Sequence, residues 1–133
     1  MTAWPTTLEF VVPGPAVGKQ RPRVVRRGGR TWAFTPKATK LFERKVWLHA
    51  MSAVQSAEAW PLNEQYRVTV LFVGTRADVD NALKSVLDGM QGATYDNDWQ
   101  VIATWAEKRT RKQGGEPRTE VRVEIIQSVN GVF

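Results

Sequence analysis

Three aspartates in the second half of the chain have the side-chain chemistry of a divalent-metal site. Asp78 and Asp80 are separated by one residue, and Asp98 follows 18 residues after Asp80. Carboxylate oxygens are the ligands that Mg²⁺ and Mn²⁺ prefer, whereas zinc prefers histidine and cysteine, of which this chain has one and none. Beside a phosphodiester, a hard cation activates water and stabilises negative charge in the transition state. The residue types therefore indicate metal-assisted phosphodiester hydrolysis.

The first two aspartates are expected where a strand ends and a helix begins. Residues 66–73 are rich in β-branched and aromatic side chains, which is typical of a central strand. A helix follows over about 81–90, and Asp80, Lys84 and Asp88 share one polar stripe at spacings of four residues. Lys84 is positioned to orient the attacking water or to neutralise a phosphate oxygen.

Asp98 begins the next predicted strand, over residues 99–109. If that strand pairs beside residues 66–73, we expect Asp98 to lie close to Asp78 and Asp80. Ordinary structural roles compete with this interpretation: Asp80 as a helix N-cap, Lys84 as an exposed ion-pair partner and Asp98 as a turn residue. From the residues alone, both interpretations stay open.

The basic residues are concentrated near the N-terminus of a chain whose net charge is +6 and whose pI is about 10.1. No acidic residue lies between Phe10 and Phe42. A solvated surface usually mixes charges of both signs, so this segment indicates a phosphate-binding arm; a flexible basic loop is the alternative. The basic residues in it are Lys19, Arg21, Arg23, Arg26, Arg27, Arg30, Lys37 and Lys40.

The remaining elements complete an α+β fold over a single domain, residues 1–133. Alternating apolar residues predict a first strand at 8–12, and Arg27-Gly28-Gly29-Arg30 predicts the turn of a basic hairpin flap. Thr35 is expected as the N-cap of a helix that runs to about Ser56, with Pro36 at its first position. A turn at 112–115 is expected to join the strand at 99–109 to a last strand in a hairpin. We expect one mixed β-sheet, two main helices and the order β-(β-hairpin)-α-β-α-β-β.

No targeting or membrane segment is expected. Residues 1–9 lack the charged and long apolar regions of a signal peptide, and no stretch approaches the roughly 20 apolar residues that cross a bilayer. With no cysteine, disulfides are excluded, which fits a reducing compartment. The sequence predicts a cytoplasmic protein that has no membrane partner.

The motif Asp78-x-Asp80-Asn81-x-x-Lys84-x-x-x-Asp88, followed by Asp98-Trp99-Gln100-Val101, resembles that of the RusA family of Holliday junction resolvases, common in bacteria, phages and prophages. Lys108 and the upstream Lys19-x-Arg21-Pro22-Arg23 also resemble phage-type members. The resemblance runs from about Leu8 to Ile126. It implies a homodimeric, Mg²⁺-dependent endonuclease that cuts four-way DNA junctions by paired nicks in recombination and repair, with Mn²⁺ as a substitute ion.

The resemblance also implies roles for individual residues. Asp78, Asp80 and Asp98 match the family's catalytic, metal-binding aspartates, and Lys84 matches its essential lysine; Asn81 and Asp88 match motif positions without an assigned role. Members often carry two adjacent acids in the second motif, whereas here Asn97 precedes Asp98 and the extra acid is Asp96. The spacing to Gln100-Val101 assigns the ligand role to Asp98. The expected DNA contacts are Lys19, Arg21, Arg23, Arg26, Arg27, Arg30, Arg76, Lys108, Arg109, Arg111 and Lys112.

Two other functions compete with junction resolution. A broader branched-DNA nuclease would act on forks or flaps during phage replication or packaging. A non-catalytic module would recognise DNA branches by shape, and the three aspartates argue against it because binding alone does not need them.

Overall fold

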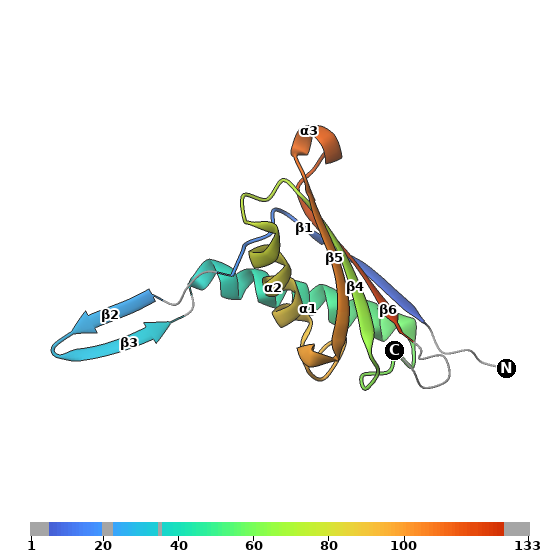
Figure 1. The fold of residues 1–133 in the computed structure, drawn as a ribbon, viewed down its shortest axis with the longest axis horizontal. Coiled ribbons are helices and arrows are strands. Elements are labelled where there is room, and N and C mark those ends of the chain that lie inside the picture. Colours follow the sequence, from blue (N-terminus) through green and yellow to red (C-terminus); the bar gives the residue numbers. More distant parts are fainter. Residues whose placement is uncertain (1–5, 20–22, 35, 127–133) are drawn as a thin grey trace.

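The computed structural model describes residues 6–19, 23–34 and 36–126 of the chain. Its centre is a mixed four-stranded sheet in the order β1-β6-β4-β5, and a separate pair of strands, β2 and β3, forms a hairpin that extends away from the sheet and helices (Figure 1). The strands are β1 (Thr7–Pro13), β2 (Arg23–Arg27), β3 (Arg30–Phe34), β4 (Tyr66–Val73), β5 (Val101–Arg109) and β6 (Arg118–Ile125).

Two long helices cover one face of the sheet. Helix α1 (Lys37–Ala57) packs on β1, and α2 (Val79–Met90) packs on α1 and β5. Alternate residues of β1, β4 and β6 are buried beneath the helices, as the two-residue period of a strand requires. Gly89 lets the helices approach closely, because a Cβ there would lie 2.8 Å from the carbonyl oxygen of Glu43. The expected α+β architecture and element order are confirmed.

The parallel pairing of β4 with β5 is the feature that most affects the site. Tyr66 is paired with Val101 and Val73 with Arg109, so both strands run in the same direction. Helix α2 makes the crossover between them and runs back along the sheet (Figure 1). The start of β5 therefore lies beside the start of β4, not beside its end.

The expected hairpin between β5 and β6 is wrong. Strand β6 lies between β1 and β4 and is antiparallel to both, so the connection from β5 crosses over the end of β4. A short helix, α3 (Arg111–Gly114), makes this crossing in place of the expected turn at 112–115. Thr110 caps it through a hydroxyl that accepts a hydrogen bond from the backbone N–H of Gln113.

Three predicted boundaries shift. Pro36 is the N-cap of α1, with no side-chain cap hydrogen bond, and Thr35, the expected cap, lies outside the described residues. Helix α2 begins at Val79, two residues before the expected start. The segment Asp98–Gln100 is a turn of 3-10 helix, η1, so β5 starts two residues later than expected. No helix in the described ranges is both long and apolar enough to cross a membrane.

Candidate active site

Asp78 and Asp80 lie together at the N-terminus of α2, both exposed to solvent. Asp78 is the N-cap residue in extended conformation, and its side chain makes no capping hydrogen bond. Asp80 lies in the first turn, where its negative charge interacts favourably with the positive end of the helix dipole. The competing interpretation of Asp80 as the N-cap is therefore wrong, and both carboxylates lie on the surface at one helix end.

Hydrogen bonds between side chains and the backbone hold the loop before Asp78 in place. The Thr75 hydroxyl donates to the carbonyl of Ala16 at 2.7 Å and accepts from the N–H of Ala77 at 3.1 Å. From β5, the Lys108 ammonium donates to the Ala77 carbonyl at 2.6 Å. Lys108, expected as a DNA contact, thus bonds to the residue preceding Asp78.

A pocket of about 220 Å³ opens beside Asp78. Gly18, Lys19, Arg76, Asp78 and Asn81 contribute to its lining. Gly18 passes so close to α2 that a Cβ there would lie 2.9 Å from the Cβ of Ala77 and 3.2 Å from that of Asn81. The loop that leads to the basic hairpin is therefore packed directly against the helix end that carries the aspartates.

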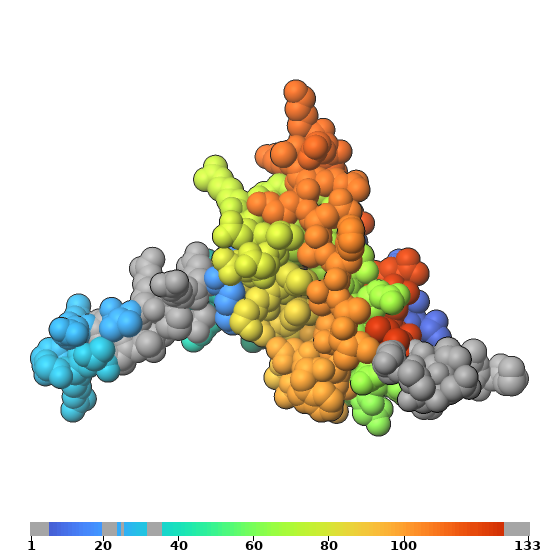
Figure 2. Space-filling model, in the orientation of Figure 1, coloured from blue at the N-terminus to red at the C-terminus, as the bar shows by residue number. Residues whose placement is uncertain are grey.

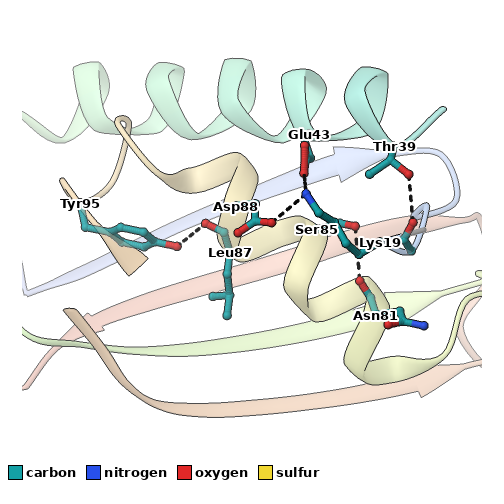
Figure 3. A network of polar contacts seen from close by, with 9 residues as sticks. Lys19, Thr39, Glu43, Asn81, Ser85, Leu87, Asp88 and Tyr95 are labelled. Carbon is teal, nitrogen blue, oxygen red and sulfur yellow. Dashed lines mark hydrogen bonds and ion pairs between the residues drawn. The ribbon is translucent and has the colours of Figure 1, made fainter. Parts of the chain in front are cut away.

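An ion-pair cluster joins this loop to both helices. The Lys19 ammonium lies 2.6 Å from a carboxylate oxygen of Glu43 on α1 and 2.9 Å from one of Asp88 on α2, as Figure 3 shows. Nearby, the Lys19 N–H donates to the Asn81 carbonyl at 3.0 Å, and the Thr39 hydroxyl donates to the Gly18 carbonyl at 3.2 Å. We call Lys19, Glu43 and Asp88 the clamp.

The clamp gives Asp88 and Lys19 defined contacts. Asp88 lies two helical turns beyond Asp80 and binds Lys19, so this motif position has a structural contact in the fold. Burial lowers the pKa of Lys19, but the hydrogen bonds and charges of Glu43 and Asp88 outweigh burial and raise it above 10.5. The charge that was expected to contact phosphate is bound within the protein.

Asp98 lies at the other end of the sheet. It is the first residue of η1, which leads directly into the start of β5. The opposite end of β5 contacts the loop before Asp78 through Lys108. At about 3.3 Å per residue, the nine residues of β5 span roughly 26 Å, so Asp98 is on the order of 20 Å from Asp78. Within the described ranges, no three acidic or histidine side chains group closely enough to hold a metal ion.

Asp98 lies near the C-terminal end of α2. Burial raises the pKa of Tyr95, and the negative charges of Asp98 and Asp88 raise it further. Gln100 is buried and donates to the carbonyls of Leu62 and Glu64 at 2.9 Å, and its side chain accepts from the Asn97 N–H. The expectation that pairing beside β4 brings Asp98 to Asp78 is wrong within one chain, because the pairing is parallel.

The basic residues expected to contact DNA fall into two groups. Arg26, Arg27 and Arg30 are exposed on the hairpin, whereas Arg21 lies outside the described residues, as does the side chain of Arg23. The second group lies near the end of β5: Arg76, Arg109, Arg111 and Lys112 are exposed there. Arg109 lies 3.3 Å from a carboxylate oxygen of Glu107.

Four residues with contacts near the site were not predicted from the sequence: Gly18, Thr39, Glu43 and Thr75. Glu43 is the first acidic residue after the long basic segment, and this position was the available signal for an internal partner of a lysine. Gly18 and the two threonines gave no signal, because their roles depend on contacts with residues far away in the chain.

Comparison with models of protein families matches residues 13–124 to "Endodeoxyribonuclease RusA". No curated protein matches the chain. The matched span includes the three aspartates, the clamp, the hairpin, β4, β5 and all but the last residue of β6, and it begins at the last residue of β1.

Replacing Lys19 with methionine is expected to lower the free energy of unfolding by about 1–2 kcal/mol at pH 7, because two partly buried carboxylates lose their partner. Since the folded-state pKa of Lys19 is raised, its contribution is complete below pH 10.5 and is lost as pH rises through the raised value. Denaturant unfolding at pH 7 and at pH 11 and above measures this.

Lys40→Met is the matched control, since Lys40 is an exposed lysine on α1. It should change stability little at either pH. Equal destabilisation by the two variants, or a Lys19→Met deficit that persists after Lys19 is deprotonated, would contradict the role assigned to the clamp.

Proposed function

The chain belongs to the RusA family of Holliday-junction-resolving endodeoxyribonucleases, which act on branched DNA, and on that premise we propose where and how it cuts. The proposed site is built on Asp78 and Asp80, with a Mg²⁺ ion, for which Mn²⁺ can substitute. The observation that supports it is two exposed carboxylates at one helix N-terminus in a basic protein, of which that of Asp78 makes no capping hydrogen bond.

The residues present suit a hard divalent cation. Asp78 and Asp80 supply carboxylate oxygens, the exposed Asn81 adds an amide oxygen, and the chain has no cysteine and one histidine for a softer metal. Mg²⁺ commonly uses one or two carboxylates and keeps several waters. When bound, the ion would activate water and offset the charge of the scissile phosphate.

Asp98 is proposed to complete this site from a second copy of the chain. Its distance from Asp78 within one chain, on the order of 20 Å, excludes a shared ion there. In a twofold dimer, each copy can give Asp98 to the site of the other. The dimer also supplies two sites, which symmetric nicking of a four-way junction requires.

Basic side chains around the site bind and orient the DNA. Lys84 is exposed one turn after Asp80 on the same helix face, where its ammonium neutralises a phosphate oxygen. Arg76 lines the pocket next to Asp78 and holds the adjoining phosphate. Asp96, two residues before Asp98, is exposed and has no catalytic role in this proposal.

The hairpin is proposed to grip a junction arm through its phosphates. Arg26, Arg27 and Arg30 are exposed on a two-stranded ribbon that projects from the body (Figure 1). The clamp fixes the start of the segment that leads to this ribbon against α2. The start of this segment is thereby connected to the helix that carries Asp80.

Asp78→Asn, Asp80→Asn and Asp98→Asn are each expected to lower junction cleavage at least about a hundredfold, because an amide is a poor substitute for a charged ligand. Junction binding should survive, since the change is nearly isosteric and removes repulsion from phosphate. Cleavage of synthetic four-way junction, fork and linear duplex, with and without Mg²⁺, measures activity, and gel shift measures binding.

Asp96→Asn is the matched control and should cleave normally. Full activity in Asp98→Asn together with loss in Asp96→Asn would show that the second acidic motif has been assigned to the wrong residue. Cleavage in the absence of any divalent ion would reject the metal proposal.

Neutralising the hairpin is expected to weaken affinity without changing the chemical step. Each phosphate interaction that is removed lowers the slope of log K against log salt by about 0.9, so replacing Arg26, Arg27 and Arg30 with alanine should lower it by up to about 2.7. Cleavage under saturating enzyme should be unchanged. The control is a double alanine variant of Arg67 and Arg122, exposed on the opposite face of the sheet. An unchanged salt slope in the hairpin variant would contradict DNA binding there.

A further inference from the structure

The position of Asp78 depends on the chain that precedes it. Its side chain is exposed and makes no capping hydrogen bond, so the start of α2 gives the carboxylate no anchor of its own. A metal ligand must lie within about 0.5 Å of its working geometry, and residues beside the ligand provide this. The first hydrogen bond of α2 joins the Ala82 N–H to the Asp78 carbonyl, so Ala77 lies outside the helix's own bonds. Ala77 is therefore a residue through which the rest of the protein can hold Asp78.

Both backbone polar groups of Ala77 are bonded by side chains. Its carbonyl accepts a hydrogen bond from the ammonium of Lys108 at 2.6 Å, and its N–H donates to the hydroxyl of Thr75 at 3.1 Å. The same hydroxyl donates to the carbonyl of Ala16, in the segment that leads to the hairpin, at 2.7 Å. Two side chains thus supply the bonds that the helix does not, and they connect Ala77 to two other parts of the fold.

Lys108 differs from its neighbours on β5 in the direction of its side chain. Its strand partner is Phe72, which is buried in the core, so Lys108 points to the face of the sheet that carries the helices. Glu107 and Arg109 point to the opposite face, where they form an ion pair at 3.3 Å. In Figure 2, the end of β5 (orange) lies against the loop that precedes α2 (yellow-green). One lysine of a basic segment therefore reaches the loop that carries Asp78.

The loop 74–77 is bonded to β5 at both of its ends. At its first residue, the Gly74 N–H donates to the Arg109 carbonyl at 2.9 Å. At its last residue, the Ala77 carbonyl accepts from Lys108. The first bond joins two backbones, whereas the second depends on one side chain, so replacing that side chain frees the end of the loop next to Asp78.

We propose that Lys108 and Thr75 are positioning residues for Asp78, which hold this metal ligand in place through the backbone of Ala77. The inference rests on the proposed function, because that function assigns a metal ion to Asp78. Lys108 is not a ligand itself, since an ammonium has donors and no acceptor. Its role is then internal to the protein, in place of the phosphate contact expected from its charge.

Lys108→Met tests the anchor on β5. Mn²⁺ titration of the DNA-free protein, followed by the EPR signal of the free ion, should show binding about 10–100-fold weaker than in the wild type, the range typical when a residue that orients a metal ligand is lost. Cleavage should fall and recover in part at higher Mg²⁺. Lys108→Arg keeps a charged donor and should restore most of the Mn²⁺ affinity. Junction affinity without metal, and its dependence on salt, should be unchanged.

Thr75→Val tests the second anchor independently. Valine is close to threonine in shape but lacks the hydroxyl, so both backbone bonds are lost, and we expect Mn²⁺ binding to weaken by a similar factor. Thr75→Ser should restore it. The matched control is Arg67→Met, a basic residue exposed on the opposite face of the sheet, which should bind Mn²⁺ as the wild type does. Denaturant unfolding shows that each variant folds, and if one replacement prevents folding, the other still decides the question.

Wild-type Mn²⁺ affinity in the folded variants would overturn the proposal. A salt slope lowered by about 0.9 in Lys108→Met, with unchanged Mn²⁺ binding, would show that Lys108 binds phosphate instead. Failure of the proposed function gives a different result, because Asp78→Asn would then bind Mn²⁺ as tightly as the wild type. If Asp78→Asn loses Mn²⁺ while Lys108→Met and Thr75→Val keep it, the proposed site stands and the positioning roles are wrong.

Discussion

The parallel pairing of β4 with β5 controls where every acidic side chain of the motif lies. Because α2 returns along the sheet between the two strands, Asp78 and Asp80 lie at one end of the sheet and Asp98 at the other. Backbone hydrogen bonds in a packed sheet do not rearrange to close a gap on the order of 20 Å. The proposed site that uses all three carboxylates therefore needs Asp98 from a second copy of the chain.

The clamp links the segment that leads to the hairpin, the proposed DNA contact, to α2, the helix of the proposed cutting site. Lys19 lies directly before the segment that leads to the hairpin, and its ammonium is bound by one carboxylate from each helix. Lys19, although it lies in a basic segment, thus forms ion pairs within the protein. The exposed arginines of the hairpin remain available to bind phosphate. The same helix α2 carries Asp80 and Lys84, which belong to the proposed site, and Asp88, which binds Lys19.

Local patterns predicted most of the fold, and pairing between distant segments explains the errors. The strand at 66–73, both long helices and the basic hairpin follow from periodicity and from Gly28-Gly29. The order of the strands depends on which edges meet, so a hairpin from β5 to β6 was expected where the chain crosses β4 instead. The prediction that Asp98 lies close to Asp78 within one chain was wrong for the same reason. Glu43 was missed because its lysine partner lies 24 residues away.

A mixed-dimer experiment tests the central claim, a site shared between two copies, most directly. Asp80→Asn and Asp98→Asn chains carrying different tags are co-expressed, and the mixed dimer is purified by both tags. One of its sites then receives an intact Asp80 from one copy and an intact Asp98 from the other, while its second site lacks both. If the site is shared, the mixed dimer nicks four-way junctions on one strand although neither parent variant cuts. A purified mixed dimer as inactive as both parents would contradict it.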